Sequence, residues 1–121
     1  MENISNEALF KAILDAYNYP VVFCDRTHTI RYMNKNARER YHGRTDIGNC
    51  IFNCHNADSK VKIEAFLARA DAGENEMFEA DSKSQKRRMF FTPVRDADGK
   101  VIGYFERHEF YGELDAAKSN G

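Results

Sequence analysis

The sequence predicts an α+β domain: a five-stranded antiparallel sheet with helices packed on one face, preceded by an N-terminal amphipathic helix. Three observations predict this class. Apolar residues recur at helical spacing near the N-terminus and again in the middle of the chain. Two short alternating runs follow the first helix, and three longer aromatic-rich runs follow the later one without a helix between them. Strands in such succession favour antiparallel pairing with segregated helices.

The chain has the size and composition of one domain with one core. Of its 121 residues 42% are hydrophobic, and the formal net charge is −1. This charge balance predicts no direct binding of nucleic acid and no attraction to a membrane surface. The basic run at residues 83–88 is too short for a nucleic-acid-binding face. No apolar stretch approaches the ~18 residues that span a bilayer.

The compartment follows from the N-terminus, which lacks the basic start and the apolar core of a signal peptide. We therefore expect a cytoplasmic protein. In that compartment Cys24, Cys50 and Cys54 should stay reduced, and an odd number of cysteines also argues against a disulfide framework.

Residues 1–19 are expected to form the N-terminal helix. Ser5 or Asn6 can cap its start, and Pro20 ends it. A helix with an apolar stripe must bury it against its own sheet or against a second copy, which predicts a symmetric homodimer through this helix and the outer sheet face. The stripe falls at positions i, i+3, i+4 and i+7: Phe10, Ile13, Leu14 and Tyr17.

A hairpin and a short helix are expected next. Residues 20–25 and 29–34 alternate apolar and polar side chains around a turn. Asn34 can cap a brief helix that Gly43 stops. Arg31 is a candidate for a cross-strand ion pair, as is Glu106 in the last strand, and either would meet a polar ligand group if it faced inward.

The middle of the chain, residues 44–59, has no clear period and suits a loop or broken helical turns. Ser59 then begins a stronger helix that Gly73 closes. The apolar face of this helix is formed by Ile63, Phe66, Leu67 and Ala70.

Three strands complete the predicted sheet, at residues 75–81, 86–94 and 100–110. Asp98-Gly99 is a strong hairpin signal between the last two. Pro93 lies near the end of its strand and indicates an edge position or a β-bulge. Residues 112–121 are small and polar, and we expect them to form a flexible tail.

The order of these elements, together with particular residues, resembles the PAS domain family. "YPVVFCD" followed by a turn and "TIRYMNKNA" is similar to the family's opening hairpin, which ends in Asn-x-x-Ala, here Asn34 and Ala37. "DIGN" and the terminal "FTPVRDADGKVIGYFERHE" resemble later elements of the family. The resemblance covers residues 8–110 and assigns the PAS domain to residues 20–111. It also implies that Asp25 and Asn34 fix turns.

The resemblance implies a sensory module of signal transduction or transcriptional regulation, not an enzyme. Such modules bind a small ligand or cofactor between sheet and helices and signal by conformational change or dimerisation. The alternative is an interaction module whose pocket is filled by side chains. We expect no output domain within these 121 residues, and therefore a homodimer, docking to a separate signalling protein, or a fragment of a longer sensor. No triad, phosphate-binding glycine loop or metal-and-base pair suggests catalysis.

The stretch "GNCIFNCHN" holds Cys50, Cys54 and His55. Covalent haem is disfavoured because Cys-x-x-x-Cys-His is a rare spacing and its attachment usually occurs outside the cytoplasm. A flavin is disfavoured because the Arg and Gln of the flavin-binding motif are missing. Zinc needs a second ligand cluster, which the chain lacks. Non-covalent haem, with His55 on the iron, and a small organic ligand stay open.

Some PAS domains carry Gly-x-Ser-hydrophobic-Phe-x-Cys-His-Asn at this place, which leaves Cys54 and His55 as the distinctive pair. Each has a plainer structural interpretation, as a small buried hydrophobe and as a histidine bonded to backbone. The candidate pocket residues are Phe23, Tyr32, Ile51, Phe52, Cys54, His55, Phe66, Phe78, Met89, Phe91 and Tyr104.

Two substitutions separate a core role from a rim role in this stretch. Phe52→Ala should cost about 3–5 kcal/mol of stability, because it truncates an aromatic side chain expected to be buried. His55→Ala should leave the melting temperature nearly unchanged and weaken retention of the native ligand. If His55→Ala unfolds the domain while Phe52→Ala is mild, His55 is structural and the pocket assignment is wrong.

Overall fold

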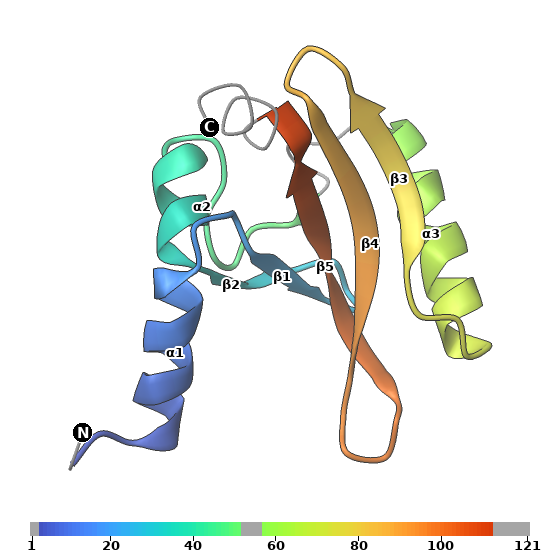
Figure 1. The fold of residues 1–121 in the computed structure, drawn as a ribbon. Helices are drawn as coiled ribbons and strands as arrows, with labels where there is room; N and C mark the ends of the chain where they lie inside the picture. The colour runs from blue at the N-terminus through green and yellow to red at the C-terminus, as the bar shows by residue number, and fades with distance from the viewer. Residues whose placement is uncertain (1–2, 52–56, 113–121) are drawn as a thin grey trace.

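The computed structural model describes residues 3–51 and 57–112 and has the predicted α+β architecture (Figure 1). Its sheet is antiparallel, with strands in the order β2-β1-β5-β4-β3. α3 lies beside β3 and β4, whereas α1 and α2 lie at the side of β1 and β2 (Figure 1). In chain order the elements are α1 (Asn6–Ala16), β1 (Val22–Asp25), β2 (Ile30–Met33), α2 (Lys35–Arg40), α3 (Ala57–Asp71), β3 (Met77–Ser82), β4 (Arg87–Arg95) and β5 (Val101–Phe110).

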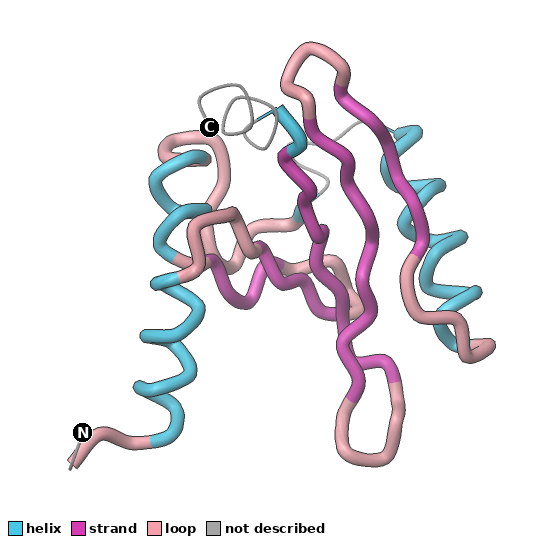
Figure 2. The backbone as a smooth tube through the Cα atoms, viewed as in Figure 1, coloured by secondary structure: helices cyan, strands magenta, loops and turns pink. Residues whose placement is uncertain are grey.

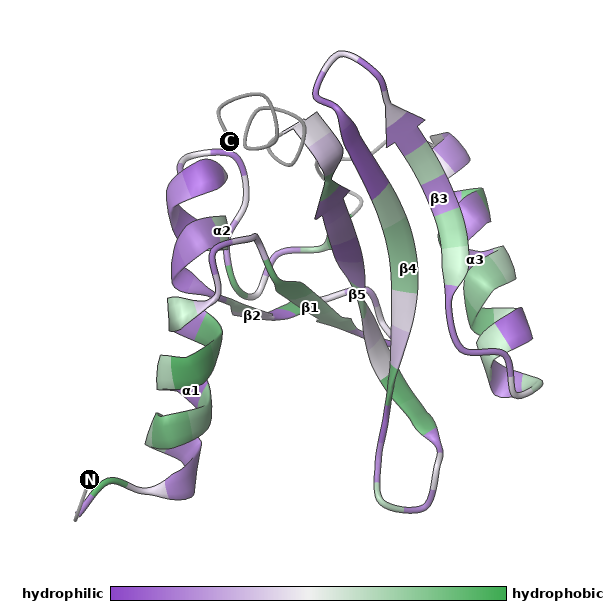
Figure 3. Ribbon diagram, viewed as in Figure 1, coloured by the Kyte–Doolittle hydropathy of each residue, from purple (hydrophilic) through white to green (hydrophobic). Residues whose placement is uncertain are grey.

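The N-terminal helix starts where the sequence predicted. The Ser5 hydroxyl caps α1 by accepting a hydrogen bond from the Ala8 amide at 3.1 Å. Tyr17 is the C-cap, three residues before Pro20. No residue of α1 is buried, although apolar residues occupy much of the helix (green in Figure 3).

The core lies between α3 and the sheet face that α3 covers, which we call the inner face; the opposite side is the outer face. The Phe66 ring of α3 lies 5.5 Å from the ring of Phe91 and 6.2 Å from that of Tyr104. α3 begins at Ala57, two residues before the predicted start. The predicted helix face is confirmed within a core of Cys24, Ile30, Met33, Ala37, Ile51, Ile63, Phe66, Leu67, Ala70, Phe91, Val101 and Tyr104.

Turn chemistry fixes both predicted hairpins. At the first, the Asp25 carboxylate accepts hydrogen bonds from the Thr27 hydroxyl at 2.6 Å and from the Thr27 amide at 2.9 Å. These bonds favour the ionised form and lower the Asp25 pKa to about 2. At the second, Gly99 has φ +83°, a conformation that L side chains rarely adopt. The Asp96 amide closes this hairpin on the Lys100 carbonyl at 2.9 Å.

Pro93 lies in an interior strand, since β4 pairs with both β3 and β5. Its position is nevertheless a local edge, because pairing with β3 ends at the Met77–Phe91 pair. A register shift between Val94 and Arg95 follows directly. The missing amide of proline is therefore tolerated there.

Residues 41–51, the described part of the connection between α2 and α3, run as loop and turns, as predicted for that part (Figure 2). α2 ends at Arg40, three residues before the predicted stop at Gly43. Residues 49–51 pair along the free edge of β2: the Ile30 amide donates to the Asn49 carbonyl at 2.9 Å and the Ile51 amide to the His28 carbonyl at 2.9 Å. This pairing covers an edge strand and brings Ile51 into the core.

Asn34 joins the first hairpin to both neighbouring helices. It caps α2, because its Oδ1 accepts a hydrogen bond from the Ala37 amide at 3.0 Å. The same oxygen accepts a hydrogen bond from the Val21 amide at 2.9 Å. Its Nδ2 donates to the carbonyls of Leu14 in α1 and Tyr19, each at 2.9 Å. The side chain is fully buried, so no water replaces these bonds if they are lost.

Asn34→Ala should destabilise the domain by ~2 kcal/mol or more, because it leaves one buried amide, one part-buried amide and two carbonyls without their partner. Asn36→Ala is the matched control, since among the described residues Asn36 makes one side-chain hydrogen bond, an exposed one from its Nδ2 to the Asn18 carbonyl at 3.0 Å, and its buried Oδ1 has no partner to lose. That variant should lose less than ~1 kcal/mol. Urea unfolding measures both, and equal losses would contradict the role given to Asn34.

Candidate functional site

A cavity of about 260 Å³ lies between the inner face of the sheet and the connection that follows α2. Residues of β1, β4 and β5 form its sheet side, and residues 41–51 form its other side. Its lining combines an apolar part with several charged and polar side chains. The lining residues are Val22, Tyr41, Arg44, Thr45, Ile51, Arg87, Met89, Glu106 and His108.

Three polar atoms of this lining are buried without a hydrogen-bond partner among residues 3–51 and 57–112. They are Thr45 Oγ1, Arg87 Nε and His108 Nδ1. His108 is only 9% exposed, and burial lowers its pKa to about 4. Its imidazole is therefore neutral at pH 7, and a neutral imidazole can present Nδ1 as a donor or an acceptor.

An acidic pair lies beside these groups. Glu79 of β3 is largely buried and shares a hydrogen bond with Glu106, which lines the cavity. Burial, and then the neighbouring carboxyl, raises the Glu79 pKa well above its ordinary value of 4.5. Two carboxyl groups in contact are more stable when one of them is protonated than when both are ionised. Glu79 therefore adds no charge to the cavity at neutral pH.

The outer face carries a second, larger hollow of about 860 Å³ between α1 and the sheet. Tyr32 crosses this space and donates a hydrogen bond to Asp15 of α1 at 3.2 Å. Phe23 lies over Gly103, where a side chain would meet its ring. The groove is lined by Ile13, Leu14, Ala16, Tyr17, Val21, Phe23, Tyr32, Val94, Ile102, Phe105 and Arg107.

The structure separates the predicted pocket residues into four groups. Ile51 and Met89 line the inner cavity. Phe66, Phe91 and Tyr104 belong to the packed core. Phe23, Tyr32 and Phe78 lie on the outer side of the sheet. Phe52, Cys54 and His55 lie outside the described residues.

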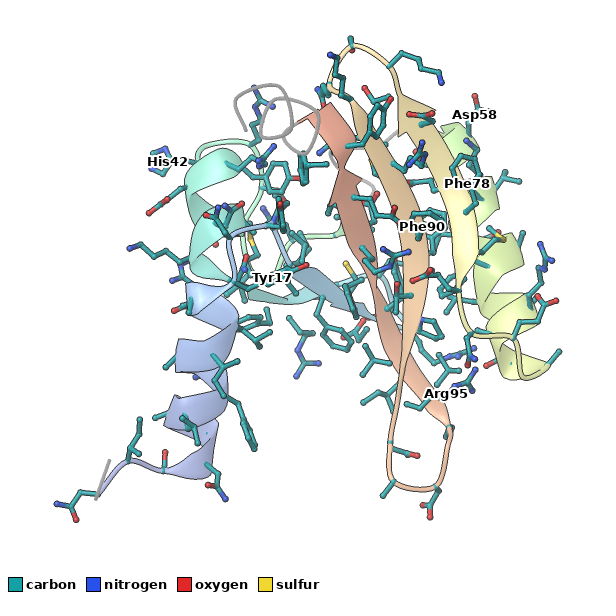
Figure 4. The ribbon with its side chains drawn as sticks, viewed as in Figure 1. Tyr17, His42, Asp58, Phe78, Phe90 and Arg95 are labelled. Carbon is teal, nitrogen blue, oxygen red and sulfur yellow. The ribbon has the colours of Figure 1, made fainter. Side chains whose placement is uncertain are left out.

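Three placements correct the sequence analysis, which expected Phe23, Tyr32 and Phe78 between sheet and helices. Phe23 pairs with Tyr32 across the first hairpin, so both point to the outer groove. Phe78 is 55% exposed and packs its ring edge to face on Phe90 at 5.7 Å (Figure 4). Side chains alternate between the two faces along a strand, so one wrongly assigned residue places every side chain of that segment on the wrong face.

Sequence reasoning did not single out Thr45, Arg87 and His108, and it gave Glu106 only a conditional role. For the strand residues the sequence held a usable pattern. Residues two apart in a strand share a face, so Arg87 lies on the face of Met89, and His108 lies on the face of Glu106. Thr45 lies in a segment without periodicity and carried no signal. Arg31 forms the expected pair, with Asp25 at 3.1 Å on the exposed hairpin.

Cysteine and metal chemistry is limited in the described part of the chain. Cys24 is buried, and burial raises its thiol pKa to about 12, which makes it a poor nucleophile. No cluster of three or more His, Cys, Asp or Glu side chains among the described residues has the arrangement of a metal site. None of the described helices combines the length and the apolar character needed to cross a membrane.

Comparison with known proteins gives one family and several similar structures. The sequence profile of the family described as "PAS fold" matches residues 14–109. Curated protein sequences gave no significant match. A C-terminal domain from Streptococcus mutans superposes with a TM-score of 0.70 at 20% identity, covering 94% of each chain. The PAS domain of a protein from Colwellia psychrerythraea gives 0.61 at 14% identity, covering 88% of this chain and 99% of that one.

A third similar structure is that of a larger protein. The phage VqmA–DPO complex gives a TM-score of 0.62 at 17% identity, and it covers 93% of this chain but 56% of that chain. At these identities the likeness concerns the fold.

The buried acidic pair predicts a pH dependence of stability. A carboxyl whose pKa is higher in the folded than in the unfolded chain contributes fully to the free energy of unfolding when the pH is below its ordinary pKa. This contribution is lost as the pH rises towards the pKa of the folded state. The wild type should therefore lose at least ~1 kcal/mol of unfolding free energy between about pH 6.5 and pH 8.5. Glu79→Gln, which cannot ionise, should remove most of this loss.

Chemical denaturation at several pH values measures the effect. His108 does not interfere, because its lowered pKa changes the stability only at pH values below 6.5, its ordinary pKa. Glu39→Gln, exposed on α2, is the control and should keep the wild-type slope. Identical slopes for the wild type and Glu79→Gln would show that the carboxyl pair does not hold a proton.

Proposed function

This chain belongs to the PAS fold family, and we propose that it is a sensory module that binds a small ligand in the inner cavity and transmits the binding to α1. Domains of this family are generally sensory and non-catalytic. The observation that carries the proposal is the cavity itself, which lies between sheet and helices and joins apolar walls to a few convergent polar groups. Ligand sites commonly have this composition.

A chain of ring contacts leads from the cavity towards α1. His108, in the cavity wall, stacks on Phe110 at 5.8 Å between ring centroids. Phe110 stacks in turn on Tyr19 at 4.8 Å, with the rings only 9° from parallel. The Tyr19 carbonyl accepts a hydrogen bond from Asn34, which also holds Leu14 of α1. A ligand that reorients His108 therefore acts on packed groups that end at α1.

The output we propose is a symmetric homodimer formed by α1 and the outer sheet face. Phe10 and Ile13 of α1 are 59% and 57% exposed, and Ile13 also lines the apolar outer groove. One surface thus supplies both exposed apolar side chains and a groove that can receive them, which is the self-complementarity that a two-fold interface requires. A change in the tilt of α1 would alter this dimer and its presentation to a separate signalling protein.

A second function is supported by the outer groove. Its volume, about 860 Å³, exceeds that of the inner cavity, so an interaction module without a ligand also accounts for the fold. Under this alternative, side-chain motion fills the inner cavity and α1 mediates only assembly.

Ligand retention separates the two functions. We expect native mass spectrometry of the wild type to show a bound small molecule beyond the 14.0 kDa chain. Met89→Trp should abolish it by filling the cavity, whereas Phe90→Trp, on the opposite face of β4, should retain it. An empty wild-type protein would favour the interaction module.

The dimer is tested with a charge on α1. Ile13→Asp should convert a dimer into a monomer in light scattering, because a carboxylate would be buried in an apolar interface. Val61→Asp, which replaces an apolar residue 66% exposed on α3, should stay dimeric. A monomeric wild type at high concentration would refute the dimer without bearing on the ligand.

A further inference from the structure

The polar groups of the inner cavity define the ligand more narrowly than the family does. Arg87 Nε is a donor only, so its partner must be an acceptor. The Thr45 hydroxyl and a neutral His108 can each donate as well. All three atoms lack a partner among the described residues, and each belongs to a side chain that lines the same cavity. If these side chains turn towards the cavity, one acceptor group with several lone pairs can bond all three.

The charges of the lining also lack balance. Arg44 and Arg87 are cationic, and Glu106 is the one acidic side chain among the lining residues that the structure describes. Neither arginine forms an ion pair within 4.0 Å in the described part of the chain. His108 and Glu79 add no charge at neutral pH, as argued above. The site therefore has one unmatched positive charge, which a monoanion would neutralise.

The size of the cavity sets the scale of the molecule. Pockets for drug-sized ligands span roughly 300–1,000 Å³, and this cavity is slightly smaller, at about 260 Å³. Val22, Ile51 and Met89 provide an apolar surface on which a short hydrocarbon body would pack.

We propose that the inner cavity binds a small organic monocarboxylate, with its carboxylate on Arg87, Thr45 and His108 and its hydrocarbon body on Val22, Ile51 and Met89. The proposal rests on the proposed function, because it names the ligand class of the same cavity. Guanidinium is well suited to the task, since its planar N–H groups match a carboxylate.

The test is a methyl NMR titration of the full chain with benzoate and hexanoate, and with benzamide and hexanamide as neutral analogues of the same shape. The carboxylates should shift the methyl signals of Met89 and Ile51 and leave those of Ile13 and Ile102 on the outer groove unchanged. The amides should bind at least about tenfold more weakly, because charge-assisted bonds are stronger than neutral ones.

Adjacent arginines provide a matched pair of variants. Arg87→Gln should weaken carboxylate binding about tenfold or more, whereas Arg88→Gln should not, because Arg88 is exposed and lies over the Tyr111 ring at 4.6 Å. Arg87→Lys keeps the charge and should keep the preference for carboxylates. Arg87→Lys can also be measured in place of Arg87→Gln if the Gln variant does not fold.

Three outcomes would overturn the proposal: amides that bind as well as carboxylates, shifts confined to the outer groove, or no binding of any carboxylate. A small molecule retained by the wild type and lost in Met89→Trp would, in each case, leave the sensory function standing and refute only the ligand class. If no carboxylate binds and the wild type also retains no small molecule, the sensory function is refuted as well.

Discussion

The amide side chain of Asn34 is bonded at every position it offers. Its oxygen accepts two backbone amides, and its nitrogen donates to carbonyls at the end of α1 and in the link to β1. Because the group is fully buried, only a side chain with one acceptor and two donors at this geometry meets all these needs. The angle at which α1 leaves the domain, the start of α2 and the entry into β1 all depend on it.

This anchorage explains how a helix without buried residues keeps a defined position. α1 contributes nothing to the hydrophobic core, and it is held at its C-terminal end by Asn34 and by Asp15, whose carboxylate accepts from the Lys35 amide at 2.8 Å. Its apolar stripe stays available on the outer side. The sheet thus carries two different surfaces, a small charged cavity on the inner face and a wide apolar groove on the outer face. Asn34 bonds α1, α2 and the link to β1 together at one point between them.

Local rules were sufficient to predict most of the fold from sequence. The Ser5 and Asn34 caps, the Asp98-Gly99 hairpin and the apolar face of α3 each depend on a few neighbouring residues, and each was confirmed. The site was less accessible. Register shifts at Phe23/Cys24 and Phe78/Ala80 change which residues share a face, and they arise from pairing that the sequence does not display. Arg87 was seen only as part of the short basic run at residues 83–88, and nothing singled out His108, because the burial of both side chains depends on a loop without periodicity.

Hydrogen exchange of α1 tests the central claim most directly, because it measures the helix that Asn34 is said to hold. Under conditions where wild type, Asn34→Ala and Asn36→Ala are all folded, the amides of residues 10–16 should exchange about tenfold faster in Asn34→Ala, while those of β4 and β5 change much less. Asn36→Ala should match the wild type. Equal exchange of α1 in all three proteins would contradict the claim that Asn34 couples α1 to the domain.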